Sequence, residues 1–232
     1  MQSGNLYGFC MNNPIRFIDP SGFDAADTFL FLQSNPRPDM SVSNGFGIWM
    51  DAILKESSKP SLVTQRQLTD MGFKNVSYNM FFELNLTLKI YSILSSTEIS
   101  HFLAQCSYES DWGRGIIEYD NAAGTYLKSK SYYPYYGAGY IQLTGERNYI
   151  AFSEAMGDPR ILEGPDYVAA NYAWRAAGWW WNSAGMNSRI ESGYTINNVS
   201  GQVTAWNKNA PDNGSYTARS NNYYTIFGVL TR

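Results

Sequence analysis

Cysteine and histidine are scarce in this chain of 232 residues, which contains 2 Cys and 1 His. The two cysteines, Cys10 and Cys106, argue against a disulfide framework, and Cys106 is predicted to be a small buried side chain. The single histidine, His101, is predicted to be a half-exposed residue with hydrogen-bond partners rather than a catalytic base. No His, Cys or carboxylate residues have metal-ligand spacing, and no glycine loop has phosphate-binding spacing. The sequence therefore predicts no metal and no other cofactor.

Charge and long apolar runs are also limited. Charged residues make up 16% of the chain and the net charge is −3, so no basic patch indicates a nucleic-acid partner. No apolar run is long enough for a membrane span, because the most apolar region, residues 174–181, contains Arg175. The first ten residues lack the basic start and the apolar run of a secretory signal. We expect a protein made in the cytoplasm that needs another apparatus for export.

Aromatic residues are abundant, with 18 Tyr, 7 Trp and 12 Phe. With 44% hydrophobic residues, a chain of this length predicts one folded domain with an appended segment. Most of the aromatic rings are expected in the core, although sugar-binding clefts also use aromatic faces.

Helical patterns dominate after the first two dozen residues, so the predicted fold class is mainly α. Helices are expected over residues 24–33, 47–55, 64–71, 79–92, 145–156 and 165–181, and residues 182–214, rich in Asn, Ser and Gly, are expected to form loops.

The clearest helix begins at Ser95, where Ser95 and Glu98 form a predicted capping box. Apolar residues from Ile99 to Cys106 follow at helical spacing and predict a stripe facing the core. Glu109 falls on nearly the same face at the C-terminal end, a placement suited to a general acid.

A second glutamate, Glu118, lies nine residues after Glu109 and is followed by the segment YYGAGYIQLTGERNY, residues 135–149. Glycosidic bond cleavage needs one acid to protonate the leaving oxygen and a second carboxylate to activate water or attack. The pair, together with the Gly-rich, amide- and hydroxyl-bearing segment that follows, therefore indicates a glycoside hydrolase. Asp111 and Asp120 remain alternative candidates for the second carboxylate.

Three segments in consistent order resemble glycoside hydrolase family 19, the chitinases and their endolysin relatives. They are FLAQCSYES (residues 102–110), YYGAGYIQLTGERNY (135–149) and GDPRILEGPDYVAANYAWRAAGWWW (157–181). The resemblance implies a lysozyme-like helical domain, with Glu109 as general acid and Glu118 as general base of an inverting reaction. The carboxyls of inverting enzymes are roughly 6.5–9.5 Å apart.

The same resemblance implies a set of substrate-binding residues: Gln142, Thr144, Asn148, Tyr149 and Asn207, with Asn209 as an alternative to Asn207. Gln142 and Thr144 also fit a purely structural role, with Thr144 capping the next helix. The chain departs from the family pattern at Tyr108, Ala138 and Arg147, where the family has His, Arg and, in plants, Tyr.

Residues 1–23 have a different, turn-rich composition and resemble the end of the core of Rhs-repeat proteins, which precedes a variable C-terminal toxin. The matching residues are Asn12-Asn13-Pro14 and Asp19-Pro20-Ser21-Gly22. The predicted organisation is thus an Rhs end (residues 1–23) and a hydrolase domain (residues 24–232).

This organisation implies an antibacterial toxin that a secretion apparatus delivers to the envelope of a target cell. It also implies peptidoglycan as the substrate and a cognate immunity protein as a partner. The alternatives are a chitinase, a lytic transglycosylase using Glu109 alone, and a non-catalytic glycan-binding module.

Overall fold

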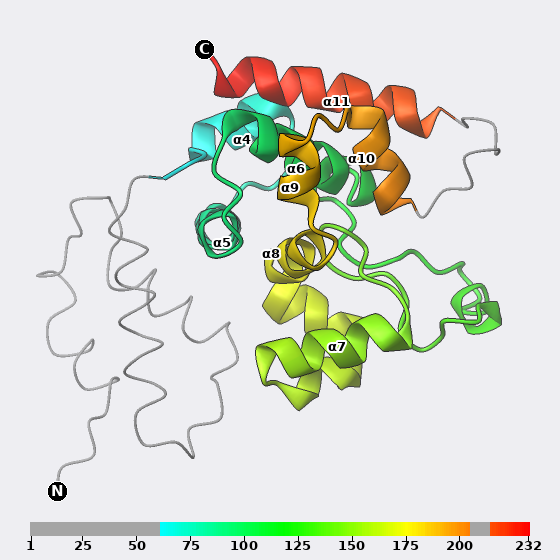
Figure 1. Ribbon diagram of the computed structural model, residues 1–232. Helices are drawn as coiled ribbons and strands as arrows, with labels where there is room; N and C mark the ends of the chain where they lie inside the picture. Colours follow the sequence, from blue (N-terminus) through cyan, green and yellow to red (C-terminus); the bar gives the residue numbers. More distant parts are fainter. Residues whose placement is uncertain (1–60, 205–213) are drawn as a thin grey trace, which may run out of the picture. The chain divides into compact units, whose positions relative to one another are not determined.

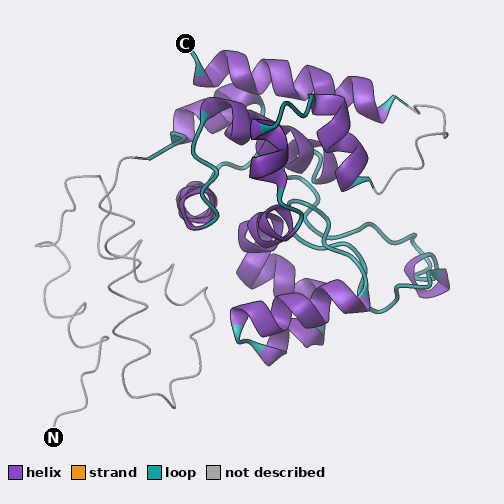
Figure 2. Cartoon of the chain, viewed as in Figure 1, coloured by secondary structure: helices purple, strands orange, loops and turns teal. Residues whose placement is uncertain are grey.

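The computed structural model describes residues 61–204 and 214–232, and residues 62–232 belong to one compact unit (Figure 1). The helices are α4 (Gln65–Met71), α5 (Tyr78–Ile90), α6 (Ser96–Glu109), η1 (Leu127–Ser129), α7 (Glu146–Met156), η2 (Pro159–Glu163), α8 (Pro165–Ser183), α9 (Met186–Glu191), α10 (Ile196–Val203) and α11 (Ser215–Leu230). Helices and loops make up the described ranges, which contain isolated β-bridges but no strand (Figure 2). The mainly helical prediction is confirmed. The expected helices over residues 24–33 and 47–55, and the boundary after residue 23, lie outside the described residues.

Local capping explains where several helices begin. The predicted capping box of α6 is present: Ser95 Oγ accepts the Glu98 N–H at 3.1 Å, and Glu98 Oε2 accepts the Ser95 N–H at 2.9 Å. An equivalent box at Thr64 starts α4 one residue later than expected. Each box satisfies backbone donors that the first helical turn leaves without partners.

The prediction of loops over residues 182–214 was wrong for the part that the structure describes, since α9 and α10 lie there. Thr195 and Asn198 form a capping box at the start of α10, and Ile196 and Val199 are buried. Tertiary burial of these apolar side chains outweighs the weak helix propensity of Asn, Ser and Gly.

Helix α6 is buried on nearly all sides, which differs from the predicted single apolar stripe. Every residue from Glu98 to Ser107 is buried, including the polar Ser100, His101 and Gln105. The reason is that α11, drawn in red in Figure 1, packs along the polar side of α6. A helix buried all round needs internal partners for its polar side chains.

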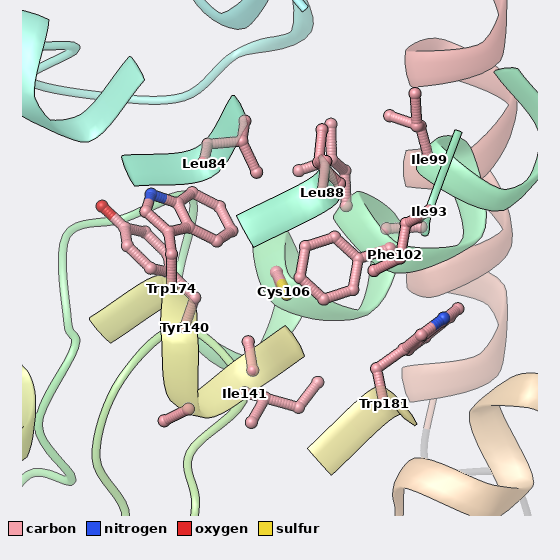
Figure 3. Packing of buried hydrophobic residues seen from close by; sticks show 14 of the residues in the cluster. Leu84, Leu88, Ile93, Ile99, Phe102, Cys106, Tyr140, Ile141, Trp174 and Trp181 are labelled. Carbon is pink, nitrogen blue, oxygen red and sulfur yellow. The ribbon is translucent and has the colours of Figure 1, made fainter. Parts of the chain in front are cut away.

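The hydrophobic core joins α5, α6 and α8 to the segment before α7 (Figure 3). Trp174 of α8 stacks on Tyr140 with 3.5 Å between ring centroids, and Trp181 meets Phe102 edge to face at 5.3 Å. Cys106 is fully buried beside these rings, as predicted, and burial raises the pKa of its thiol. This packing fixes α6 against the segment that carries the predicted substrate residues.

None of the helices in the described part of the chain is both long and apolar enough to cross a lipid bilayer.

His101 corrects the prediction of a half-exposed histidine: its side chain is buried on α6 against Tyr223 of α11, 4.5 Å between ring centroids. Its Nδ1 is buried and has no hydrogen-bond partner. Burial lowers the pKa of His101 from 6.5 to about 4. Protonation therefore opposes the packing of α6 on α11.

We expect this histidine to make stability depend on pH. Between pH 6.5 and 4 the unfolded chain binds a proton that the folded chain does not, so folding is weakened as the pH falls through this window. The contribution is on the order of 2 kcal/mol, allowing for partial screening. Denaturant unfolding at pH 7 and pH 4.5 should show this loss, and His101→Phe should reduce it. An equal loss in both proteins would contradict the assignment.

Candidate active site

Glu109 is the last residue of α6, and its half-buried carboxylate forms an ion pair with Arg219 of α11. The guanidinium of Arg219 is almost fully buried and also donates to Gln105 Oε1 at 2.7 Å. Its central carbon lies 4.1 Å from the centroid of the Tyr108 ring. Arg219 thus contacts three residues in the last turn and a half of α6 and holds the Glu109 side chain at a defined place.

Gln105 continues this network toward α10, because its Nε2 donates to Ser200 Oγ at 3.2 Å. Asn222, on the next turn of α11 after Arg219, donates to Ser107 Oγ at 2.9 Å. The role of Arg219 was not predicted from the sequence, because a partner 110 residues away leaves no local pattern. The sequence feature that could have indicated this role is the presence of an arginine in the aromatic, weakly charged C-terminal segment.

Glu118 follows an extended segment in the long connection between α6 and α7. Its backbone N–H donates to the Gly137 carbonyl at 2.8 Å, and the Gly137 N–H donates to Glu118 Oε2 at 2.9 Å. The other carboxylate oxygen, Oε1, accepts a hydrogen bond from the Tyr132 hydroxyl at 2.7 Å. Both oxygens of Glu118 are therefore held, one by the backbone and one by a side chain.

Both glycines of the GAG sequence lie in close approaches, and Gly139, which meets backbone atoms, is the one that requires glycine. A Cβ on Gly137 would lie 2.4 Å from Gln142 Oε1, and a Cβ on Gly139 would lie 2.6 Å from the Ala173 carbonyl oxygen. Gly139 also has a left-handed φ of +72°. Between them, Ala138 is fully buried and pairs with both Ile117 and Leu143. The position where the family has Arg is thus interior in this chain.

Hydrogen bonds connect the surroundings of the two glutamates. Ser110, directly after Glu109, accepts the Gly115 N–H on its carbonyl at 2.9 Å. The Gly115 carbonyl in turn accepts from Gln142 Nε2 at 3.3 Å. Gln142 lies against the glycine whose N–H binds Glu118. The end of α6 and the Glu118 segment are therefore parts of one bonded arrangement.

Three of the predicted substrate-binding residues, Gln142, Thr144 and Asn148, make hydrogen bonds to nearby backbone carbonyl groups. Gln142 Nε2 also donates to the Gly139 carbonyl at 3.2 Å, so its amide supports the turn in which its own φ is +54°. Thr144 Oγ1 donates to the Gln142 carbonyl at 2.8 Å, and Asn148 Nδ2 donates to the Thr144 carbonyl at 2.7 Å. Helix α7 is capped by Gly145 without a side-chain bond, so Thr144 does not cap it.

Tyr149 is fully buried, which leaves it no surface for direct contact with a substrate. Its hydroxyl donates to the Tyr136 carbonyl at 2.8 Å, and its ring packs on Tyr135 at 4.9 Å. Tyr149 thus stabilises the segment around Tyr135 and Tyr136 from its buried side. Asn207 and its alternative Asn209 lie outside the described residues.

The two alternative carboxylates are engaged in local structure. Asp111 is exposed and accepts from Arg114 on both oxygens, at 3.0 and 3.1 Å. Asp120 Oδ1 accepts the backbone N–H groups of Asn121 and Leu127, at 2.8 and 3.1 Å, and so closes the following loop. In residues 61–204 and 214–232, no three His, Cys, Asp or Glu side chains are arranged to hold a metal ion.

Comparison with known proteins gives relatives of one kind. No family model matches the chain. Two endochitinases of Arabidopsis thaliana are each 37% identical over 97 residues, which is 38% of this chain and 34% and 33% of theirs. Chitinase 3 of Oryza sativa subsp. japonica is 34% identical over 105 residues, 36% of this chain and 32% of its own. The matched region spans about a third of the length of these relatives.

Solved structures agree with the fold. Chitinase C from Streptomyces griseus HUT6037 superposes with a TM-score of 0.60 at 20% identity, covering 75% of this chain and 78% of that one. A mutant of chitinase C superposes with a TM-score of 0.58, also at 20% identity, covering 75% of this chain and 94% of that one. This chain therefore has the helical, lysozyme-like fold of chitinase C and is similar in sequence, over little more than a third of its length, to plant chitinases.

Proposed function

We propose that this protein is a glycoside hydrolase that cleaves β-1,4-linked amino-sugar polymers, with Glu109 as general acid and Glu118 as general base. The observation that carries the proposal is the bonded arrangement that holds both glutamates. Arg219 orients one carboxylate, and the Gly137 N–H and the Tyr132 hydroxyl orient the other. Positioned pairs of carboxylates are the machinery of glycoside hydrolysis.

The surroundings of the two carboxylates differ in a way that suits two roles. Glu109 ends a buried helix, at the negative end of the helix dipole, and its side chain is 22% exposed. Glu118 lies in a loop, where its two oxygens accept hydrogen bonds from the Tyr132 hydroxyl and the Gly137 N–H. An inverting hydrolase likewise assigns separate roles, proton donor and base, to its two carboxylates.

Peptidoglycan is the proposed substrate, because toxins placed after an Rhs core attack neighbouring bacteria, and peptidoglycan is the β-1,4-linked amino-sugar polymer of the bacterial envelope. This step rests on the resemblance of residues 1–23, which lie outside the described residues. The same proposal includes delivery by a secretion apparatus and a cognate immunity protein in the producing cell. Chitin is the second candidate, favoured by the similarity to plant chitinases and to chitinase C.

The experiment is a parallel digestion of purified peptidoglycan and of chitin oligomers by the full chain, with the products identified by mass. We expect soluble fragments from peptidoglycan that end in reducing sugars. Fragments from chitin alone would make the protein a chitinase, and anhydro-sugar ends would indicate a lytic transglycosylase that uses Glu109 without a base. Binding to either polymer without any product would indicate a glycan-binding module.

A further inference from the structure

Within residues 61–204 and 214–232, the hydroxyl of Tyr132 is the one side-chain group that donates a hydrogen bond to Glu118. We propose that Tyr132 is a positioning residue, which orients the general base so that it receives a proton from the attacking water. This inference rests on the proposed function of Glu118, and it concerns a residue that the sequence patterns did not single out.

The backbone alone holds only one of the two oxygens of the Glu118 carboxylate. The Gly137 N–H fixes Glu118 Oε2 at 2.9 Å, and the antiparallel bridge between Ile117 and Ala138 fixes the main chain beside it. With a single hydrogen bond, the carboxylate plane can still rotate about its last torsion, which is broad for glutamate. The 2.7 Å bond from Tyr132 to Oε1 removes this freedom.

Toward Glu118, the Tyr132 hydroxyl acts only as a hydrogen-bond donor. Burial, followed by the hydrogen bond to Glu118 and the charge of that residue, raises the pKa of Tyr132 to about 12. The phenol therefore keeps its proton at any pH at which the enzyme works, and it cannot replace Glu118 as the base. Each oxygen of Glu118 still has a second lone pair that is able to accept from water.

The Tyr132 hydroxyl is not needed to fold the loop that contains Tyr132. The segment is closed by backbone bonds, from the Tyr135 N–H to the Tyr132 carbonyl at 2.8 Å and from the Tyr133 N–H to the Lys130 carbonyl at 3.2 Å. The Tyr132 ring is half-buried and is not part of the hydrophobic core formed by the described residues. Removing one oxygen atom should leave this loop folded.

Tyr132→Phe in the full chain is the test. We expect kcat for cleavage to fall about 10-fold or more with little change in KM, because the base loses its orientation and not its contact with substrate.

Tyr133→Phe is the matched control, because Tyr133 is the next residue and its ring is 46% exposed and stacked on Tyr136. It should keep the kcat and the KM of the wild type. Both variants should unfold thermally within a few degrees of the wild type, which separates an altered site from an altered fold.

Two outcomes distinguish this inference from the function on which it rests. In a Glu118→Ala background, the added Tyr132→Phe should change the residual rate by less than about twofold, because the two residues act through one another. A Tyr132→Phe enzyme with wild-type kcat, alongside an inactive Glu118→Ala enzyme, would overturn the positioning role and leave the proposed function standing. Full activity of Glu118→Ala would overturn both.

Discussion

Replacement of Glu109 by Gln is expected to reduce glycan cleavage by about 10³-fold or more, because Gln has the same shape but no proton to donate to the leaving oxygen. Arg219, from α11, forms an ion pair with Glu109 and also contacts Gln105 and Tyr108 of the same helix. Release of reducing sugars from peptidoglycan or chitin oligomers measures the effect. Binding of the same polymers should persist.

The same change should also lower stability, by about 1–3 kcal/mol, since the buried charge of Arg219 loses its carboxylate partner. Denaturant unfolding separates this loss from the loss of activity: the protein should remain folded at the assay temperature. Glu154→Gln, the same change at an exposed position of α7, is the control and should leave both quantities unchanged. A Glu109→Gln enzyme with more than a few per cent of wild-type activity would exclude this residue as the acid.

Replacement of Glu118 by Ala is expected to reduce turnover by about 10²- to 10³-fold, because no carboxylate then activates the water. The small cavity left by Ala gives azide a place from which to attack, so azide should restore part of the rate. The wild-type products should have the anomeric configuration opposite to that of the substrate, as an inverting mechanism requires. NMR of the first products, before mutarotation, shows this configuration.

Asp111 and Asp120, the alternative candidates for the general base, are the control positions for Glu118→Ala. Asp111→Asn removes only an exposed ion pair with Arg114, and Asp120→Asn keeps the oxygen that accepts the loop N–H groups. Both variants should stay active. If Asp111→Asn or Asp120→Asn were inactive and Glu118→Ala were active, the role of general base would belong to that aspartate. Products of retained configuration would reject the inverting mechanism.

Several local features of this protein could be read from neighbouring residues alone. The capping box at Ser95 and Glu98 is present, and the predicted buried positions of Phe102 and Cys106 are buried. Helix starts and apolar spacings depend on residues within one or two turns, so the pattern that predicts them is short. The same kind of pattern placed Glu109 at the end of its helix.

Contacts between distant segments could not be predicted from the sequence. The partners of Glu109 and Glu118 lie 110 and 14–19 residues away, and the burial of His101 depends on α11. The loops predicted over residues 182–214 include two helices for the same reason, because burial against the core compensates for poor helix propensity.

The sequence by itself determined the helical class of this protein, the helix that ends in Glu109 and the two glutamates, because each of these is written in residue types and short spacings. Only the tertiary structure decided that Arg219 pairs with Glu109, that Tyr132 holds Glu118, and that Tyr149 lies beneath the site. The physical reason is that burial and ion pairing depend on which surfaces meet when the chain folds, and segments far apart in the sequence supply those surfaces.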